Sequence, residues 1–201
     1  MDADSVSSPG RGSGHHIWWA PVSDLTQREE LPLTDLVVRH LPQNEVIENA
    51  LRKKVSLLPE KPIRELLANC LVHQDLTISG ASPMVEIYND RVEFSNPGEP
   101  IVPVERFIDG WLSRSERLTS LMGRMRICEQ KSSGIDRVVA AAELFQLPAP
   151  EFRIGYKRTI AVVFGPKPFE AMDRDDRVRA CFQHCVLKWV TNGRMTNQSL
   201  R

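Results

Sequence analysis

Between residues 59 and 75, apolar and polar positions recur with the period of an α-helix. Two prolines near the start of this stretch suit the first turn of a helix, where a backbone N–H has no acceptor to lose. An apolar stripe follows, and Glu65, Asn69 and His73, which are four residues apart, share a face beside it. The pattern predicts an amphipathic helix with an acid, an amide and an imidazole along one wall. A solvated polar stripe is the common alternative for such spacing.

Further along the chain, two short segments alternate apolar and polar residues with the period of a β-strand. Residues 84–88 and 91–95 follow this pattern, and a two-residue Asn-Asp turn lies between them. The sequence therefore predicts a β-hairpin, which ends in the proline- and glycine-containing stretch 96–100. Another strand is predicted over residues 159–164.

Five other segments have helical periodicity. Asn44 is a candidate N-cap for a helix that continues to Lys54, and a short helix is predicted over residues 104–109. Three further helices are predicted after residue 116, over residues 135–145, and beyond the charged linker at residues 173–177. The apolar faces that we expect for these three comprise Leu118, Leu121, Met122 and Met125; Val138, Val139 and Ala142; and Val178, Cys181, Phe182, Cys185, Val186 and Trp189.

Composition narrows the class of protein. A chain of 201 residues can hold one well-packed core and part of a second unit. The formal net charge is zero, so a contact with DNA would require a local patch. No stretch has the length and apolarity of a membrane span or signal peptide, and we therefore expect a cytoplasmic protein without membrane insertion.

The four cysteines, Cys70, Cys128, Cys181 and Cys185, are too few for a disulfide scaffold and lie among apolar residues. We expect core thiols in a reducing compartment. The spacing of Cys181, His184 and Cys185 raises zinc binding as an alternative, but no second ligand pair follows.

Residues from about 58 to 164 resemble the GHKL-type ATPase domain of Schlafen/AlbA-type, RecG-like bacterial ATP-binding proteins and transcriptional regulators. Three stretches carry the resemblance in the family's order, namely residues 64–75, 85–98 and 133–138. The resemblance implies an α/β (α+β) two-layer sandwich with the GHKL/Bergerat-like ATPase fold, followed by a partial winged-helix segment. It implies that ATP binds between the helices and a mixed sheet.

The polar wall of the predicted helix suits Mg-nucleotide chemistry. A carboxylate such as Glu65 can orient or deprotonate a water, which makes it the catalytic candidate. The amide of Asn69 is a neutral oxygen ligand that suits Mg²⁺, which keeps several waters and binds to substrate phosphates. We therefore predict that Asn69 is the metal ligand and that both Asn69 and His73 contribute to cofactor binding.

The resemblance places three further segments at the nucleotide. Asn96 stands where the family has the aspartate that binds the adenine amino group, and Gly98 lies in the same turn. An asparagine can still pair with adenine because it has both a donor and an acceptor. Arg114 is a candidate phosphate contact, and Ser133 and Gly134 belong to a turn whose following helix can bind phosphate at its N-terminus.

The same resemblance divides the chain into three parts. Residues 1–43 are a divergent N-terminal segment, of which residues 1–14 are rich in Ser, Gly and Asp and should be disordered. Residues 44–167 are the GHKL-like ATP-binding domain. Residues 173–201 resemble the truncated start of a winged helix-turn-helix. We expect a shortened or divergent member of the family.

Two functions remain open at this point. The first is an ATP-binding, slowly ATP-hydrolysing domain of a bacterial DNA-binding transcriptional regulator, with ATP and Mg²⁺ as cofactors, DNA as a partner of the full-length protein, and homodimer formation. The second is a nucleotide-free scaffold for dimerisation or regulation. Glu99 and Ser132 replace two glycines of the family pattern, which favours slow hydrolysis or the scaffold.

Overall fold

The structure is a computed structural model that describes residues 16–21, 33–41, 43–48, 51–56, 59–110, 112–125 and 134–199. The strands are β1 (His16–Pro21), β2 (Gln43–Glu48), β3 (Leu51–Ser56), β4 (Met84–Tyr88), β5 (Arg91–Pro97), β6 (Glu151–Gly155) and β7 (Arg158–Phe164). The α-helices are α2 (Leu33–His40), α3 (Glu60–Val72), α4 (Glu116–Arg124), α5 (Ile135–Leu144) and α6 (Arg174–Val190). Two 3₁₀ turns, η1 (Val104–Arg106) and η2 (Phe169–Ala171), complete the described elements.

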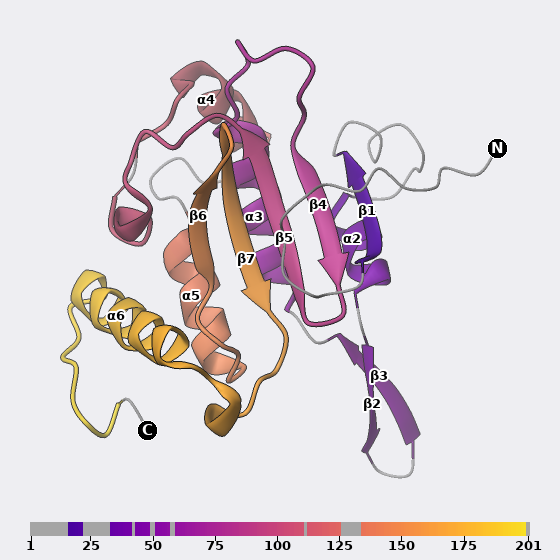
Figure 1. Cartoon of the computed structure of the whole chain (residues 1–201), viewed down its shortest axis with the longest axis vertical. Helices are drawn as coiled ribbons and strands as arrows, with labels where there is room; N and C mark the ends of the chain where they lie inside the picture. Colours follow the sequence, from indigo (N-terminus) through magenta and orange to yellow (C-terminus); the bar gives the residue numbers. More distant parts are fainter. Residues whose placement is uncertain are drawn as a thin grey trace.

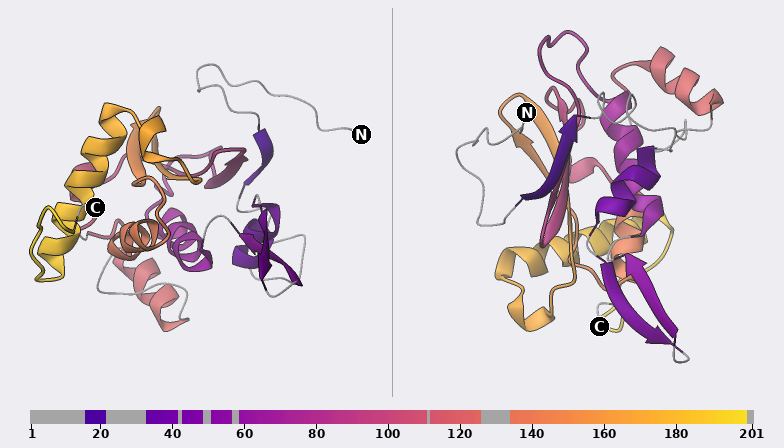
Figure 2. Two further views of the ribbon diagram at one scale, coloured as in Figure 1. Left: turned by 90° about the horizontal axis from the view of Figure 1, so that it is seen from below. Right: turned by 90° about the vertical axis from the view of Figure 1, so that its right-hand side faces the viewer.

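Five strands form an antiparallel sheet in the order β1-β4-β5-β7-β6. Helices α2, α3 and α5 lie in a row against one face of this sheet (Figure 1; Figure 2, left), and the main core fills the space between the two layers. The predicted α+β two-layer class is therefore confirmed.

The strand period explains the hydrophobic core. In β4 and β5, Val85, Ile87, Val92 and Phe94 alternate along the chain, and all four are fully or almost fully buried in the main core. The predicted β-hairpin is confirmed, with β4 paired to β5. The predicted strand at 159–164 is β7, an interior strand between β5 and β6.

The opposite face of the sheet carries buried polar residues, among them Glu93 and Ser95, beside the apolar Val162 and Ile160. Glu93, on β5, has no exposed surface, and its carboxylate accepts hydrogen bonds from Arg91 Nε at 2.8 Å and Arg153 Nη2 at 3.0 Å. A buried carboxylate needs such partners because its desolvation is otherwise costly. The two cations therefore fix Glu93 in the centre of the sheet.

The helix predicted from Asn44 to Lys54 is wrong. This segment forms the two-stranded antiparallel sheet β2–β3, in which Glu45 lies opposite Lys54. The first strand is acidic and the second is basic, and both contain β-branched residues, which favour strands. The segment therefore forms a β-hairpin instead of the helix that its apolar positions predicted.

Two other predictions for the helices need correction. Residues 104–109 contain only the three-residue turn η1, not a longer helix. In α4, Met122 is buried, but Leu121 and Met125 are exposed rather than facing the core, and Leu118 is half-buried. Helix α4 lies at one end of the molecule, beyond the row of helices against the sheet (Figure 2), so only part of its apolar surface is covered.

The prediction for the last helix is wrong for five of its six apolar residues, because Val178, Cys181, Phe182, Cys185 and Trp189 are exposed, whereas Val186 is partly buried against the core. The buried residues of α6 are Gln183, His184 and Leu187. Cys181 and Cys185 are exposed thiols, so they are not core residues, whereas Cys70 is buried as predicted. In contrast, α5 buries Val138, Val139 and Ala142 as expected.

Polar contacts explain why α6 turns this face inward. Gln183 Nε2 donates to the carbonyl oxygen of Pro150 at 2.6 Å. The two ring nitrogens of His184 lie 2.9 Å from Glu143 Oε1 and 3.0 Å from Ser199 Oγ. Leu187 completes the contact with the core.

Within the described residues, no helix is both long enough and apolar enough to cross a membrane. The predictions for residues 1–14, Cys128 and Ser133 lie outside the described residues.

Candidate functional site

A cavity of about 120 Å³ lies between α3 and the sheet, and we call it the α3 pocket. Its walls come from α3, β5, β7, the start of β6, the start of α5, the segment from residue 100 to residue 114 and the first turn of α4. The apolar lining residues include Leu66, Phe94, Ile101, Phe107, Ile135, Phe152 and Ala161, and the polar ones are Asn69, His73, Asn96, Ser113, Arg114, Thr119 and Thr159. Its lining, apolar with a few polar groups, is typical of a small-molecule site, but its volume is below the roughly 300–1,000 Å³ of such sites.

Glu65, Asn69 and His73, which the sequence placed on one wall, do not all face the same cavity. Asn69 and His73 line the α3 pocket, but Glu65 does not. An i, i+4 step rotates a helical residue by about 40°, so Glu65 and His73 differ by about 80° in direction. This drift turns Glu65 toward α5, where its Oε1 lies 3.4 Å from Arg137 Nη1.

Gly134 lies against this same carboxylate. It is the N-cap of α5 with a φ of 71°, and a Cβ at this position would clash with the carboxylate of Glu65. A carboxylate at a helix N-terminus is favourable because of the helix dipole. Gly134 thus allows Glu65 to approach α5 closely. Gly134 does not line the α3 pocket, and its proximity to a phosphate stays a prediction.

The polar end of the α3 pocket is formed by β5 and β7. Asn96 is buried, and its Nδ2 donates to the carbonyl oxygens of His73 and Pro97, each at 3.3 Å. These two bonds leave its carbonyl oxygen as an acceptor. Thr159 pairs with Asn96 in the sheet register and also lines the pocket. The sequence alone did not single out Thr159, because only the β5–β7 pairing brings it to Asn96.

Gly98 supports this end of the pocket without lining it. Its φ is 101°, and a Cβ there would lie 2.7 Å from Asp75 Cβ. Its N–H donates to the carbonyl oxygen of Lys157, and its own carbonyl oxygen accepts from Thr159 Oγ1, both at 2.8 Å. Gly98 therefore permits a close crossing of three segments.

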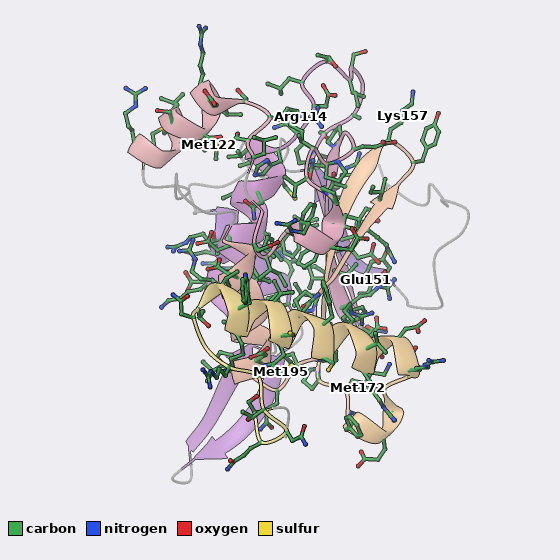
Figure 3. All side chains as sticks on the ribbon, turned by 90° about the vertical axis from the view of Figure 1, so that its left-hand side faces the viewer. Arg114, Met122, Glu151, Lys157, Met172 and Met195 are labelled. Carbon is green, nitrogen blue, oxygen red and sulfur yellow. The ribbon has the colours of Figure 1, made fainter. Side chains whose placement is uncertain are left out.

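Arg114 lines the pocket and lies at the same end of the molecule as the β6–β7 turn with Lys157 (Figure 3). Its Nη1 donates to Asp75 Oδ2 at 3.3 Å, and its Nη2 donates to the carbonyl oxygen of Glu99. Its buried Nε has no hydrogen-bond acceptor among the described residues. The guanidinium is therefore fixed on one side and retains a donor for a ligand.

Asp75 was not identified from the sequence as a site residue. Its carboxylate accepts hydrogen bonds from Thr77 Oγ1 at 2.6 Å and from the Thr77 backbone N–H at 3.0 Å. These bonds, with a smaller contribution from Arg114, hold the pKa of Asp75 below its usual value. Asp75 is therefore an anion that orients Arg114.

Two titratable residues of the α3 pocket, His73 and Cys70, are neutral near pH 7. Burial, with a smaller contribution from Arg114, lowers the pKa of His73 below its ordinary 6.5. Burial raises the pKa of the Cys70 thiol to about 12. The pocket therefore presents an imidazole and a thiol without charge, and Arg114 supplies its positive charge.

Asn69 is the pocket residue that would suit Mg²⁺ bound together with a phosphate ligand. No cluster of three or more His, Cys, Asp or Glu residues suited to a metal occurs among the described residues. The amide of Asn69 would be one oxygen ligand, and Mg²⁺ readily takes its remaining ligands from phosphates and water.

The chain is an α+β protein, in which an antiparallel sheet and one layer of helices enclose a largely apolar pocket. Residues 80–164 match the family described as "Putative ATP-dependent DNA helicase recG C-terminal". This match supports a RecG-like ATPase domain in that part of the chain, in agreement with the resemblance found in the sequence.

The DIP2311 protein from Corynebacterium diphtheriae is a solved structure with the same fold, with a TM-score of 0.57 and 17% sequence identity. The similarity covers 84% of this chain and 37% of the length of that chain. No curated protein matches the sequence.

Proposed function

We propose that the α3 pocket binds ATP together with Mg²⁺. One observation carries this proposal: the fold brings Asn69, Asn96, Arg114 and Thr159 from four separate segments to one apolar cavity. The RecG-like match over residues 80–164 supports the choice of nucleotide.

The pocket offers a distinct role to each polar residue. The carbonyl oxygen of Asn96 accepts from the exocyclic amine of adenine, and Thr159 lies beside it. Phe94 and Phe152 cover the base with apolar surface. Arg114 donates to phosphate through Nε while Asp75 holds the other side of its guanidinium.

Asn69 is the proposed Mg²⁺ ligand. When bound, Mg²⁺ neutralises phosphate charge and helps to orient the phosphate chain. Glu65 is the proposed group that orients water, but its carboxylate is paired with Arg137 and lies outside the pocket lining. We therefore expect binding to be readily measurable and hydrolysis to be slow.

Isothermal titration of the whole chain with ATP and Mg²⁺ tests the proposal. Asn96→Ala should weaken binding about five- to thirtyfold, because one lost hydrogen bond to a buried ligand is worth about 1–2 kcal/mol. Asn69→Ala should weaken binding only when Mg²⁺ is present. Asn89→Ala, in the exposed β4–β5 turn, is the matched control. Absence of heat from the folded wild type at millimolar ATP would exclude the proposal.

The Glu65–Arg137 ion pair also favours the second function, a nucleotide-free scaffold that uses the fold for regulation or dimerisation. The titration separates the two functions, because a scaffold would not bind ATP with or without Mg²⁺.

The role in a DNA-binding transcriptional regulator, with a Schlafen/AlbA-type context and a winged helix beginning within residues 173–201, stays a prediction. It has one local support: Ser199 N–H donates to Thr196 Oγ1 at 3.1 Å and Thr196 N–H donates to Ser199 Oγ at 3.0 Å. This reciprocal pair is a capping box, which marks a helix start. Fluorescence anisotropy with a random-sequence duplex tests DNA binding, and unchanged anisotropy at low salt would contradict it.

A further inference from the structure

Helix α6 carries an apolar stripe on the side that faces away from the protein. The stripe consists of Val178, Phe182, Cys185 and Trp189, and the exposed fractions of the Val, Phe and Trp are 58%, 47% and 77%. Cys185 is also exposed. Helix α6 lies on the outside of the molecule (Figures 1 and 3), so the stripe is accessible along the helix.

Helical geometry separates this stripe cleanly from the buried face. At about 100° per residue, the four stripe residues fall within about 60° of one another, whereas Gln183, His184 and Leu187 lie on the opposite side. A second helix could therefore contact the stripe without displacing the contacts that hold α6 to the rest of the protein. Exposed aromatic side chains gathered in this way are typical of an interaction surface.

The spacing of the stripe identifies the kind of partner. The steps between its residues are four, three and four positions, the a/d spacing by which two helices pack along each other. Two copies of α6 in antiparallel orientation would place Val178 opposite Trp189 of the second copy and Phe182 opposite Cys185 of the second copy. Each layer then pairs a large aromatic residue with a small residue.

A parallel pair would lack this complementarity. It would place Trp189 against Trp189 of the second copy and Phe182 against Phe182, while the two small residues would leave gaps. Poorly filled layers lose dispersion contacts and burial. The antiparallel arrangement is also isologous, so that the same stripe serves both copies and the assembly closes as a dimer.

We infer that α6 is a homodimerisation surface in which two copies of this chain pair antiparallel through Val178, Phe182, Cys185 and Trp189. One helix pair is small beside a standard interface, so the dimer is weak and concentration-dependent. This surface is independent of the α3 pocket and of nucleotide binding.

Sedimentation velocity of the whole chain over a concentration series tests the surface. The wild type should show a monomer–dimer equilibrium, and Phe182→Glu should weaken it at least about tenfold because a charge would be buried in the seam. Tyr156→Glu is the matched control, since Tyr156 is an 88% exposed aromatic residue in the β6–β7 turn. A wild type that stays monomeric, or a dimer that Phe182→Glu leaves unchanged, would overturn the inference.

Oxidative cross-linking tests the orientation separately. In a Phe182→Cys variant that also carries Cys181→Ser, the antiparallel pair should join the introduced thiol to Cys185 of the second copy, because these positions form one layer. Peptide mapping of the covalent dimer identifies the linkage. A link between the two introduced thiols would instead show parallel pairing and overturn the proposed arrangement. Circular dichroism verifies that each variant folds.

Discussion

Helices α3 and α6 depart from the usual amphipathic pattern in opposite ways. In α3, the carboxylate-bearing Glu65 is only 8% exposed, and Asn69 and His73 are half-buried. In α6, Phe182 and Trp189 face solvent while Gln183 and His184 are buried. Burying polar groups requires partners, and exposing aromatic surface forgoes the gain of burial. The comparison connects our two proposals: the polar residues Asn69 and His73 line the proposed ligand pocket beside α3, and the exposed aromatic residues of α6 form the proposed dimer surface.

Position in the fold explains the difference between the two helices. Helix α3 lies in the middle of the helical row, between α2 and α5 and against the sheet, so most of its surface is covered (Figure 2, left). Helix α6 lies outside this row. Its orientation therefore depends on a few contacts, in particular those of Gln183 with Pro150 and of His184 with Glu143.

The largest expected effect comes from two substitutions within α6. Leu187→Ala should lower the free energy of unfolding by about 2–4 kcal/mol, because Leu187 packs in the core and its truncation to alanine creates a cavity. Phe182→Ala should change the stability of the monomer by no more than about 0.5 kcal/mol, since its side chain is exposed. Urea denaturation at low protein concentration measures both. A larger loss for Phe182→Ala would mean that the stripe packs within the monomer and that the contrast with α3 fails.

The second effect concerns the close approach of α5 to α3. Gly134→Ala should destabilise the protein by about 2–3 kcal/mol, because it adds a left-handed conformation for a non-glycine residue to a clash with Glu65. Gly80→Ala is a matched control: Gly80 has a φ of 75°, but a Cβ there would meet nothing within 4 Å. It should cost only about 1–2 kcal/mol. Equal losses for the two variants would show that Glu65 moves away easily.

The sequence predicted those parts of the fold that depend on local pattern. The hairpin β4–β5, the helices α3 and α5 and the buried strand β7 all have a clear period and are flanked by turn residues. Residues 43–56 were misassigned because their short apolar pattern is compatible with a helix, and strand pairing overrides such a weak local preference. The face of α6 was misassigned because an apolar stripe identifies a contact surface without specifying whether the contact is within the same chain.

The candidate site shows the same limit. The sequence indicated Asn69, His73, Asn96 and Arg114, and all four line the α3 pocket. It did not indicate Asp75 or Thr159, because their positions depend on hydrogen bonds and strand register between distant segments. It also placed Glu65 and Asn69 on one wall, whereas the drift of the helix turns them toward different neighbours.

The third effect tests whether Glu65 acts in stability or in chemistry. Glu65→Gln should lower the free energy of unfolding by about 1–2 kcal/mol through loss of its partly buried ion pair with Arg137. The affinity for ATP should change little, because Glu65 does not line the α3 pocket. Asp136→Asn, a carboxylate in the first turn of the same helix α5, controls for the general electrostatic effect. A variant that keeps full stability but loses ATP binding would place Glu65 at the ligand.

The smallest expected effect is a pH dependence caused by His73. Burial and Arg114 lower the pKa of its imidazole in the folded state, whereas the unfolded chain keeps the ordinary value of 6.5. The unfolded state therefore binds more protons as the pH falls, so the contribution of His73 to stability is complete above pH 6.5 and is lost progressively toward the folded pKa. His73→Gln should remove this loss, and the difference in melting temperature between the wild type and the variant should shift in favour of the variant below pH 6.5. His40→Gln, on α2 outside the pocket, is the control. Parallel pH profiles for the wild type and His73→Gln would contradict the prediction, because they would show that folding does not lower the pKa of His73. The imidazole would then be solvated, and the contrast between the buried polar residues of α3 and the exposed apolar residues of α6 would be weaker.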